Sequence, residues 1–315
     1  MLPLESVPNV SEGRDVSIVA SIGLRFAGFG ASLVDRHLDP DHDRTVFTLL
    51  GDERSLEDGL VAGVAEASRS IDLRRHDGIH PRVGAADVVP VVPLAGEDLE
   101  RAEAVARAVA RRIGNELGLS VFLYGTLCEG RRPAFYRRGG PAALERRVES
   151  GELEPAHGPR ELDPRAGAVL VGVRAPLLAF NVVLDGGSLD DAREVAAAVR
   201  ESSGGLPGVQ ALGLLLRGGA VQVSTNILDL GATPPHLLVQ RIVEEAGARG
   251  ARVGAGELVG LVPAAGVAAA AAAAGVDEPL DARGVPTADA LTAAARMLRL
   301  EQLDPDRVIE WHVEQ

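Results

Sequence analysis

The chain has 315 residues, of which 46% are apolar and 24% charged, a composition typical of globular proteins. Its 32 basic residues are all arginines, and against 45 acidic residues they leave a formal charge of −13, which disfavours a nucleic-acid partner. The absence of lysine excludes Schiff-base chemistry and a lysine-dependent phosphate loop, and the single cysteine, Cys128, excludes an internal disulfide.

In the first half of the chain, the spacing of apolar residues predicts the order strand, helix, strand, strand, helix, strand. We expect strands at 2–10, 31–38, 45–50 and 86–93, and helices at 15–28 and 55–71, the first capped within 11–14. Two helices among four strands in this order are typical of the split βαβ, or ferredoxin-like, unit. A helix at 97–117 and a strand at 120–125 extend it.

The second half repeats the same order of elements. Strands are expected at 176–185, 209–216, 220–228 and 251–262, and helices at 189–201 and 235–249. Because a single core rarely grows beyond about 250 to 300 residues, two lobes are expected. We therefore predict an α+β protein made of two ferredoxin-like (βαββαβ) subdomains, an internal structural duplication, with domains at 1–175 and 176–315.

The remaining segments give weaker signals. Residues 130–167 predict a short helical excursion followed by an irregular loop, and 275–286 a polar linker. The alanine-rich run 258–275 is too weakly apolar to cross a bilayer and predicts a buried helix. Alternation over 308–313 predicts an added strand. With one cysteine and no secretory signal, we expect a cytoplasmic protein that does not associate with membranes.

The densest group of chemically useful side chains lies in a loop at 76–84. It holds His76, Asp77, His80 and Arg82 among glycines and a proline. A histidine transfers protons near neutral pH, and an arginine binds a carboxylate through two nitrogens. We favour acid/base function for His80, whereas His76 fits a structural role equally well. A metal site is disfavoured, because ligands four residues apart converge only on a helix.

A second polar cluster, residues 35–45, connects two predicted strands. Its four carboxylates and two imidazoles fit a cation site, a partner for a catalytic histidine, or a solvated hairpin tip. Asp35 and Arg44 stand out because the sheet fixes strand-edge side chains.

Polar residues also interrupt otherwise apolar strands. Asn181 follows four apolar residues, and Gln222, Ser224 and Asn226 alternate with Val221, Val223 and Thr225. Alternation places the first three on one strand face, which either meets water or binds a polar ligand. Asn9, close to a predicted helix start, is a further candidate because free backbone N–H groups attract anions there.

Six segments in matching order together resemble the glutamate formiminotransferase family, the amino-terminal part of formiminotransferase-cyclodeaminase. They are Glu5–Gly13, Asp41–Val46, His80–Val88, Ala179–Val182, Gln222–Asn226 and Glu257–Pro263. The chain departs from the family pattern at Asp43, where Asn is common, at Leu214 and Leu215, where Trp and Tyr are common, and at Val10, where Phe is frequent.

The resemblance implies an enzyme that moves the formimino group from N-formimino-L-glutamate to N5 of tetrahydrofolate. The products are 5-formiminotetrahydrofolate and L-glutamate, in histidine degradation and one-carbon metabolism. Tetrahydrofolate would be a co-substrate, and no metal would be needed. Family members have two ferredoxin-like subdomains with the substrate channel between them, and they are dimeric, so the resemblance implies a homodimer.

The resemblance also assigns residues. The catalytic histidine of its His-Pro-Arg motif falls on His80. Its folate-binding stretch falls on Gly158, Pro159, Arg160, Glu161, Leu162, Asp163, Pro164, Arg165, Ala166 and Gly167. Because both substrates carry carboxylates, Arg44 and Arg82, with Arg165 or Arg174, are expected to make the site locally positive. The substrate-binding candidates are Asn9, Asp35, Arg44, Arg82, Asn181 and Asn226.

Two other classes of function stay open. One is a metal-dependent hydrolase that uses His37, His42, His76 and His80 with nearby aspartates. The other is a folate-binding protein without turnover.

Overall fold

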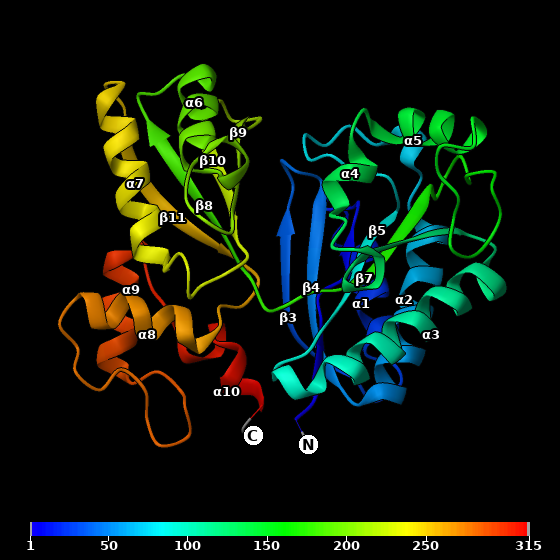
Figure 1. Ribbon diagram of the computed structural model, residues 1–315, viewed down its shortest axis with the longest axis horizontal. Helices are drawn as coiled ribbons and strands as arrows, with labels where there is room; N and C mark the ends of the chain where they lie inside the picture. Colours follow the sequence, from blue (N-terminus) through cyan, green and yellow to red (C-terminus); the bar gives the residue numbers. More distant parts are fainter. Residues whose placement is uncertain (1, 314–315) are drawn as a thin grey trace. The chain divides into compact units, whose positions relative to one another are not determined.

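The computed structural model describes residues 2–313, which form two compact units (Figure 1). One unit ends at Ala175 and the other begins at Pro176. Each combines helices with one β-sheet, which confirms the predicted α+β class. No helix among these residues is both long enough and apolar enough to cross a membrane.

The sheet of the first unit has a strand order that the sequence only partly predicts. Strands β1 and β2 both pair with β4 and β5 and so act as one interrupted strand, β3 pairs with β4 at one side, and β7 and β6 follow β5. Strand β7 is parallel to β5 and β6, whereas the other pairs are antiparallel. The strands are β1 (Leu4–Ser6), β2 (Asn9–Val10), β3 (Ser32–Asp39), β4 (Arg44–Gly51), β5 (Ala86–Val92), β6 (Ser120–Gly125) and β7 (Ala168–Val173). Strand β7 was not expected.

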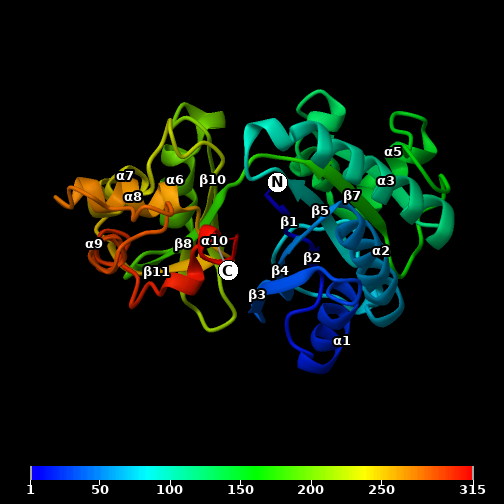
Figure 2. The same cartoon turned by 90° about the horizontal axis from the view of Figure 1, so that it is seen from below.

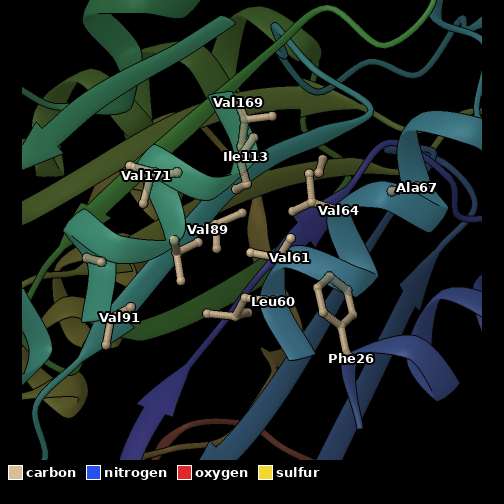
Figure 3. Close-up of a cluster of buried hydrophobic side chains, with 14 of the residues drawn as sticks. Phe26, Leu60, Val61, Val64, Ala67, Val89, Val91, Ile113, Val169 and Val171 are labelled. Carbon is tan, nitrogen blue, oxygen red and sulfur yellow. The ribbon is translucent and has the colours of Figure 1, made fainter. Parts of the chain in front are cut away.

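Three long helices cover one face of this sheet, and Figure 2 shows α2 and α3 lying along β5 and β7. They are α1 (Val16–Phe26), α2 (Glu53–Ser70) and α3 (Leu99–Leu117). Phe26, Leu60 and Val64 pack from the helices against Val89 and Val171 of the strands (Figure 3). Helix α1 begins later than expected, because the Asp15 carboxylate accepts the N–H groups of Ser17 and Ile18 and so caps it.

Two short helices, α4 (Pro133–Arg137) and α5 (Gly140–Glu149), pack with a different set of strand residues. Val88 and Leu170 belong to this second cluster, whereas their neighbours Val89 and Val171 belong to the first. Because successive side chains of a strand point to opposite faces, α4 and α5 cover the reverse face over β5, β6 and β7. The short helical excursion predicted after residue 130 is therefore present.

The reverse face of the β2, β3 and β4 strands carries polar side chains. Phe47 and Leu49 of β4 point into the core, so Arg44 and Thr48 point the other way. Across the β3–β4 pair, Asp39 lies opposite Arg44 and Asp35 opposite Thr48. Directly opposed residues share a face, so Asp35, Asp39, Arg44 and Thr48 lie together on the face away from the core, next to the apolar Val46 and Leu50.

The second unit follows the predicted order β8-α6-β9-β10-α7-β11. Its antiparallel sheet is ordered β11-β8-β10-β9, and α6 and α7 pack on it (Figure 1). Phe180, Val182 and Val223 point into its core. The elements are β8 (Leu178–Asp185), α6 (Leu189–Val199), β9 (Val209–Leu215), β10 (Val221–Ile227), α7 (Pro235–Ala248) and β11 (Arg252–Val259).

The remaining segments correct two expectations. The strand predicted at 308–313 is wrong, because Ile309–Val313 forms the short helix α10 and places the Glu310 carboxylate 2.8 Å from the Ala264 N–H. That contact caps α8 (Ala264–Ala273), and the residues of the alanine-rich run before Pro263 belong partly to β11. Helix α9 (Ala288–Met297) follows the polar linker. Short 3-10 turns lie at Leu73–Arg75, Gly96–Asp98, Thr126–Cys128, Glu201–Ser203 and Pro305–Arg307.

Candidate functional site

The two polar clusters that the sequence presents separately form one site in the first unit. The turn between β3 and β4 meets the loop at 76–84, and the rings of His42 and His80 lie 6.0 Å apart. Gly78 permits this approach, because a side-chain carbon there would lie 2.2 Å from the His42 carbonyl oxygen. Close packing of backbone against backbone therefore brings the histidines together.

His80 is held as a neutral imidazole. Its Nε2 lies 2.7 Å from Arg44 Nη1, and since an arginine nitrogen only donates, Nε2 accepts and the ring proton sits on Nδ1. Burial, followed by the charges of Arg44 and Arg137, lowers the pKa of His80 well below its ordinary value of 6.5. The ring can thus accept a proton at neutral pH once the Nε2 lone pair is uncovered.

Arg44 has the character of an anion receptor. It is partly buried on β4, and its Nε is buried with no hydrogen-bond partner among residues 2–313. Burial, with a contribution from Arg137, lowers its pKa to about 9, although Asp87 and Asp39 act in the opposite direction. A buried donor without an acceptor is unfavourable, so this guanidinium is suited to receive a carboxylate.

Asp39 orients the second histidine. One carboxylate oxygen of Asp39 pairs with Nδ1 of His42, and the other accepts the His42 N–H at 2.8 Å. Burial by itself would raise the pKa of Asp39, but the hydrogen bonds from His42 outweigh it and lower that pKa. His42 is buried, so the solvated hairpin tip, one of the three interpretations left open for this cluster, does not apply to this residue.

His76 has a structural role, which the sequence leaves undecided. Its Nδ1 accepts the Gly78 N–H at 3.1 Å, and its Nε2 donates to the Asp43 carbonyl at 2.8 Å. Burial lowers its pKa. Asp43 has a φ of 50° and accepts the Gly13 N–H at 3.0 Å, which anchors the turn.

Arg82 closes its own loop. Its Nη2 donates to the carbonyl oxygens of Gly78 and His80, the latter at 2.6 Å. Asp87, which sequence reasoning missed, accepts the Val83 N–H at 2.7 Å and pairs with Arg137 of α4. A carboxylate near the start of an otherwise apolar strand was the available signal for Asp87.

The predicted folate stretch, residues 158–167, is hydrogen-bonded to segments on both sides of His80. The Ala85 N–H donates to the Ala166 carbonyl and the Leu73 N–H to the Arg165 carbonyl, at 2.8 and 2.9 Å. Gly167 has a φ of 68°, and a side-chain carbon there would lie 2.1 Å from the Val83 carbonyl oxygen. Leu162 and Ala166 are buried, whereas Arg160 and Arg165 are exposed.

The polar face of the second sheet is present as predicted. Asn181, Gln222, Ser224 and Asn226 all lie on the side away from the core of the second unit. Asn181 lies opposite Glu257 of β11 and donates to its Oε2 at 3.0 Å. Glu257 was not among the sequence candidates.

The remaining candidates stay on the polar faces of their sheets. Asn9 uses its Nδ2 to donate to the Val7 carbonyl at 2.8 Å, while its Oδ1 is buried without a partner within the described chain. Asp35 stands opposite Thr48. Across residues 2–313, no three histidine, cysteine, aspartate or glutamate side chains gather closely enough to hold a metal ion.

Comparison with known proteins identifies relatives over nearly the whole chain. Residues 3–174 match the formiminotransferase domain, N-terminal subdomain, and residues 179–305 match the formiminotransferase domain. A glutamate formimidoyltransferase of Streptococcus pyogenes is 35% identical over 83% of this chain and 89% of its own length. One of Thermoplasma acidophilum is 34% identical, over 82% and 88%.

A formimidoyltransferase-cyclodeaminase of Sus scrofa is 36% identical over 82% of this chain, which spans half the length of that relative. The bacterial and archaeal relatives, by contrast, are matched over most of their length. With both units matched in order, the chain belongs to the formiminotransferase family.

Proposed function

We propose that the protein transfers the formimino group of N-formimino-L-glutamate to N5 of tetrahydrofolate, releasing L-glutamate. One observation supports this above the others: His80, held neutral beside the guanidinium of Arg44, lies in the His-Pro-Arg segment that carries the resemblance to the formiminotransferase family. The site thus combines a proton acceptor with an anion receptor, and the reaction needs both.

The proposed reaction requires two proton movements. N5 of tetrahydrofolate attacks the formimino carbon, and a tetrahedral intermediate forms. His80 accepts the proton that N5 loses and then donates a proton to the glutamate nitrogen as its bond to carbon breaks. A neutral histidine can perform both steps in turn without net gain or loss of protons.

The contact between Arg44 and His80 suggests how the substrate prepares the site. Arg44 occupies the Nε2 lone pair of His80 that a base must use. A substrate carboxylate is a stronger acceptor for a guanidinium than a neutral imidazole is. Binding of that carboxylate to Arg44 would therefore uncover Nε2, so that His80 becomes a base only when substrate is present.

The other candidate residues are proposed as ligands around this reaction. Residues 158–167 would bind folate, and the exposed Arg160 and Arg165 suit the carboxylates of its glutamyl tail. Asn9, Asp35 and Arg82 would complete the substrate site in the first unit, and Asn181 and Asn226 are the substrate-binding candidates of the second unit. The position of 158–167 directly beside residues 83–85 supports this assignment.

We further propose that 1–175 and 176–315 are the two subdomains of one enzyme, and that it works as a homodimer in the cytoplasm without a metal. The division of the chain at Ala175 and Pro176 supports the first part. The family resemblance supports the homodimer and the metal-free reaction, and the single cysteine supports the cytoplasm. Light scattering on the purified protein would give twice the chain mass for a homodimer.

The test is incubation of purified protein with N-formimino-L-glutamate and tetrahydrofolate, followed by absorbance of the folate product and an assay of released glutamate. Product formation that survives a metal chelator supports the transferase. Hydrolysis abolished by the chelator would indicate a metal-dependent hydrolase. Tetrahydrofolate binding by calorimetry without glutamate release would indicate a binding protein.

A further inference from the structure

The polar face of the second sheet contains a small polar cluster in which two side-chain amides donate to the carboxylate of Glu257. Asn181 and Gln222 are each 4% exposed, and both direct an amide nitrogen to Glu257 Oε2, at 3.0 and 3.4 Å. Glu257 itself is exposed on β11. Two buried amides therefore orient a carboxylate that solvent can reach.

The orientation of Gln222 is the second observation. Because its nitrogen donates to Glu257, its carbonyl oxygen Oε1 points elsewhere, and this oxygen is buried without a hydrogen-bond partner among residues 2–313. A buried acceptor without a donor is unfavourable, and a bridge whose only purpose was to hold three strands together would not require one. The oxygen therefore indicates a ligand that supplies a hydrogen-bond donor.

We propose that Glu257 and Gln222, oriented by Asn181, bind a planar N–C–N edge that carries N–H donors. A carboxylate only accepts hydrogen bonds, and it recognises such an edge as it recognises a guanidinium. The inference rests on the proposed function, because both proposed substrates have this chemistry. In tetrahydrofolate it is the N3–H and 2-amino edge of the pterin, and in N-formimino-L-glutamate it is the amidine group.

The test uses the full chain with Glu257→Gln, which keeps the size of the side chain and removes its charge. Tetrahydrofolate affinity is measured by calorimetry. The KM for N-formimino-L-glutamate is measured from the rate of glutamate release at saturating tetrahydrofolate. We expect either the affinity for tetrahydrofolate to fall or the KM for N-formimino-L-glutamate to rise, by about 10- to 100-fold. Weaker tetrahydrofolate binding assigns the site to the pterin, and a higher KM alone assigns it to the amidine.

Two further variants make the result decisive. Gln222→Leu removes the unpartnered oxygen. It should weaken binding of the same ligand whose binding Glu257→Gln weakens. Glu278→Gln removes another exposed carboxylate from a loop of the same unit and should change neither constant. Circular dichroism confirms that each variant is folded.

The outcomes separate this inference from the function on which it rests. If the unmodified protein transfers the formimino group and Glu257→Gln leaves both constants unchanged, the inference is wrong and the function stands. If the unmodified protein neither binds tetrahydrofolate nor releases glutamate, the proposed function itself fails.

Discussion

At the scale of single residues, the surroundings of His80 decide its charge. Its pKa is lowered by burial and by the positive charge of Arg44, so the ring is unprotonated at pH 6.5, where an unperturbed histidine is half protonated. The acid limb of the kcat/KM profile, which reports the free protein, should therefore lie below pH 6.5, because activity is lost only when the base becomes protonated. Measuring kcat/KM for N-formimino-L-glutamate between pH 4.5 and 8 tests this.

Arg44→Gln should move that acid limb to higher pH. Removing a positive charge next to the ring makes protonation easier, so the pKa of His80 rises and the base is lost earlier as pH falls. Arg36→Gln, on the adjacent strand, should leave the profile in place. An unchanged profile in Arg44→Gln would show that Arg44 does not control this histidine.

His80→Ala should retain tetrahydrofolate binding and lose most transfer. Positioned proton transfer contributes about 10² to 10⁴ in rate, whereas holding two substrates together contributes separately. Stopped-flow or steady-state glutamate release measures the loss, with His312→Ala as a control of the same type. Undiminished turnover in His80→Ala would refute the assignment.

Asp43 tests the departure from the family pattern. Its left-handed backbone and its acceptor role toward Gly13 are both compatible with asparagine, so Asp43→Asn should lose only the ion pair with Arg14, about 0 to 1 kcal/mol. Asp43→Val should lose about 2 to 5 kcal/mol, since a branched residue strains that backbone and leaves the Gly13 N–H unpaired. Urea unfolding gives both values, and equal losses would contradict this account.

At the scale of elements, the site depends on the contact between the β3–β4 turn and the loop at 76–84. Gly78→Ala should push these segments apart, because the new carbon meets the His42 carbonyl oxygen and cannot be accommodated by a side-chain rotation. We expect a loss of about 1 to 3 kcal/mol in unfolding free energy, together with reduced transfer.

Gly96→Ala is the matched control, because a side-chain carbon at Gly96 meets nothing within 4 Å. It should leave both the unfolding free energy and the transfer rate close to those of the unmodified protein. Equal effects of the two substitutions would show that the close contact at Gly78 does not shape the site.

Prediction of elements from the sequence succeeded where apolar residues recur at helical spacing over many residues, as in α2, α3 and α7. It failed for short segments whose state depends on a distant partner. Residues 309–313 alternate like a strand, but Glu310 reaches the N-terminus of α8 and the segment is helical. Strand β7 exists because β5 and β6 lie on either side of it.

At the scale of the whole molecule, each unit has its own apolar core. The residues of the largest apolar cluster in the first unit all come from the sequence range 4–173, and those of the second unit from 178–308. We therefore predict that the segment 176–315 folds when expressed alone. Circular dichroism with cooperative thermal unfolding would support this, whereas a disordered segment would contradict it.

The sequence alone determined what its local patterns encode: the α+β class, the β-α-β-β-α-β order with which each unit begins, the polar face of β10, and the motifs of a formiminotransferase. Periodicity and turn chemistry act over a few residues, so they can be read without the fold. Tertiary structure decided the rest. It brought together Arg44 and His80, which are 36 positions apart in the sequence, and fixed the histidine tautomers. It also revealed the hydrogen-bonding roles of Glu257 and Asp87 and the capping role of Glu310. Charge states and hydrogen-bond partners depend on burial and on groups distant in the chain, which no local pattern contains.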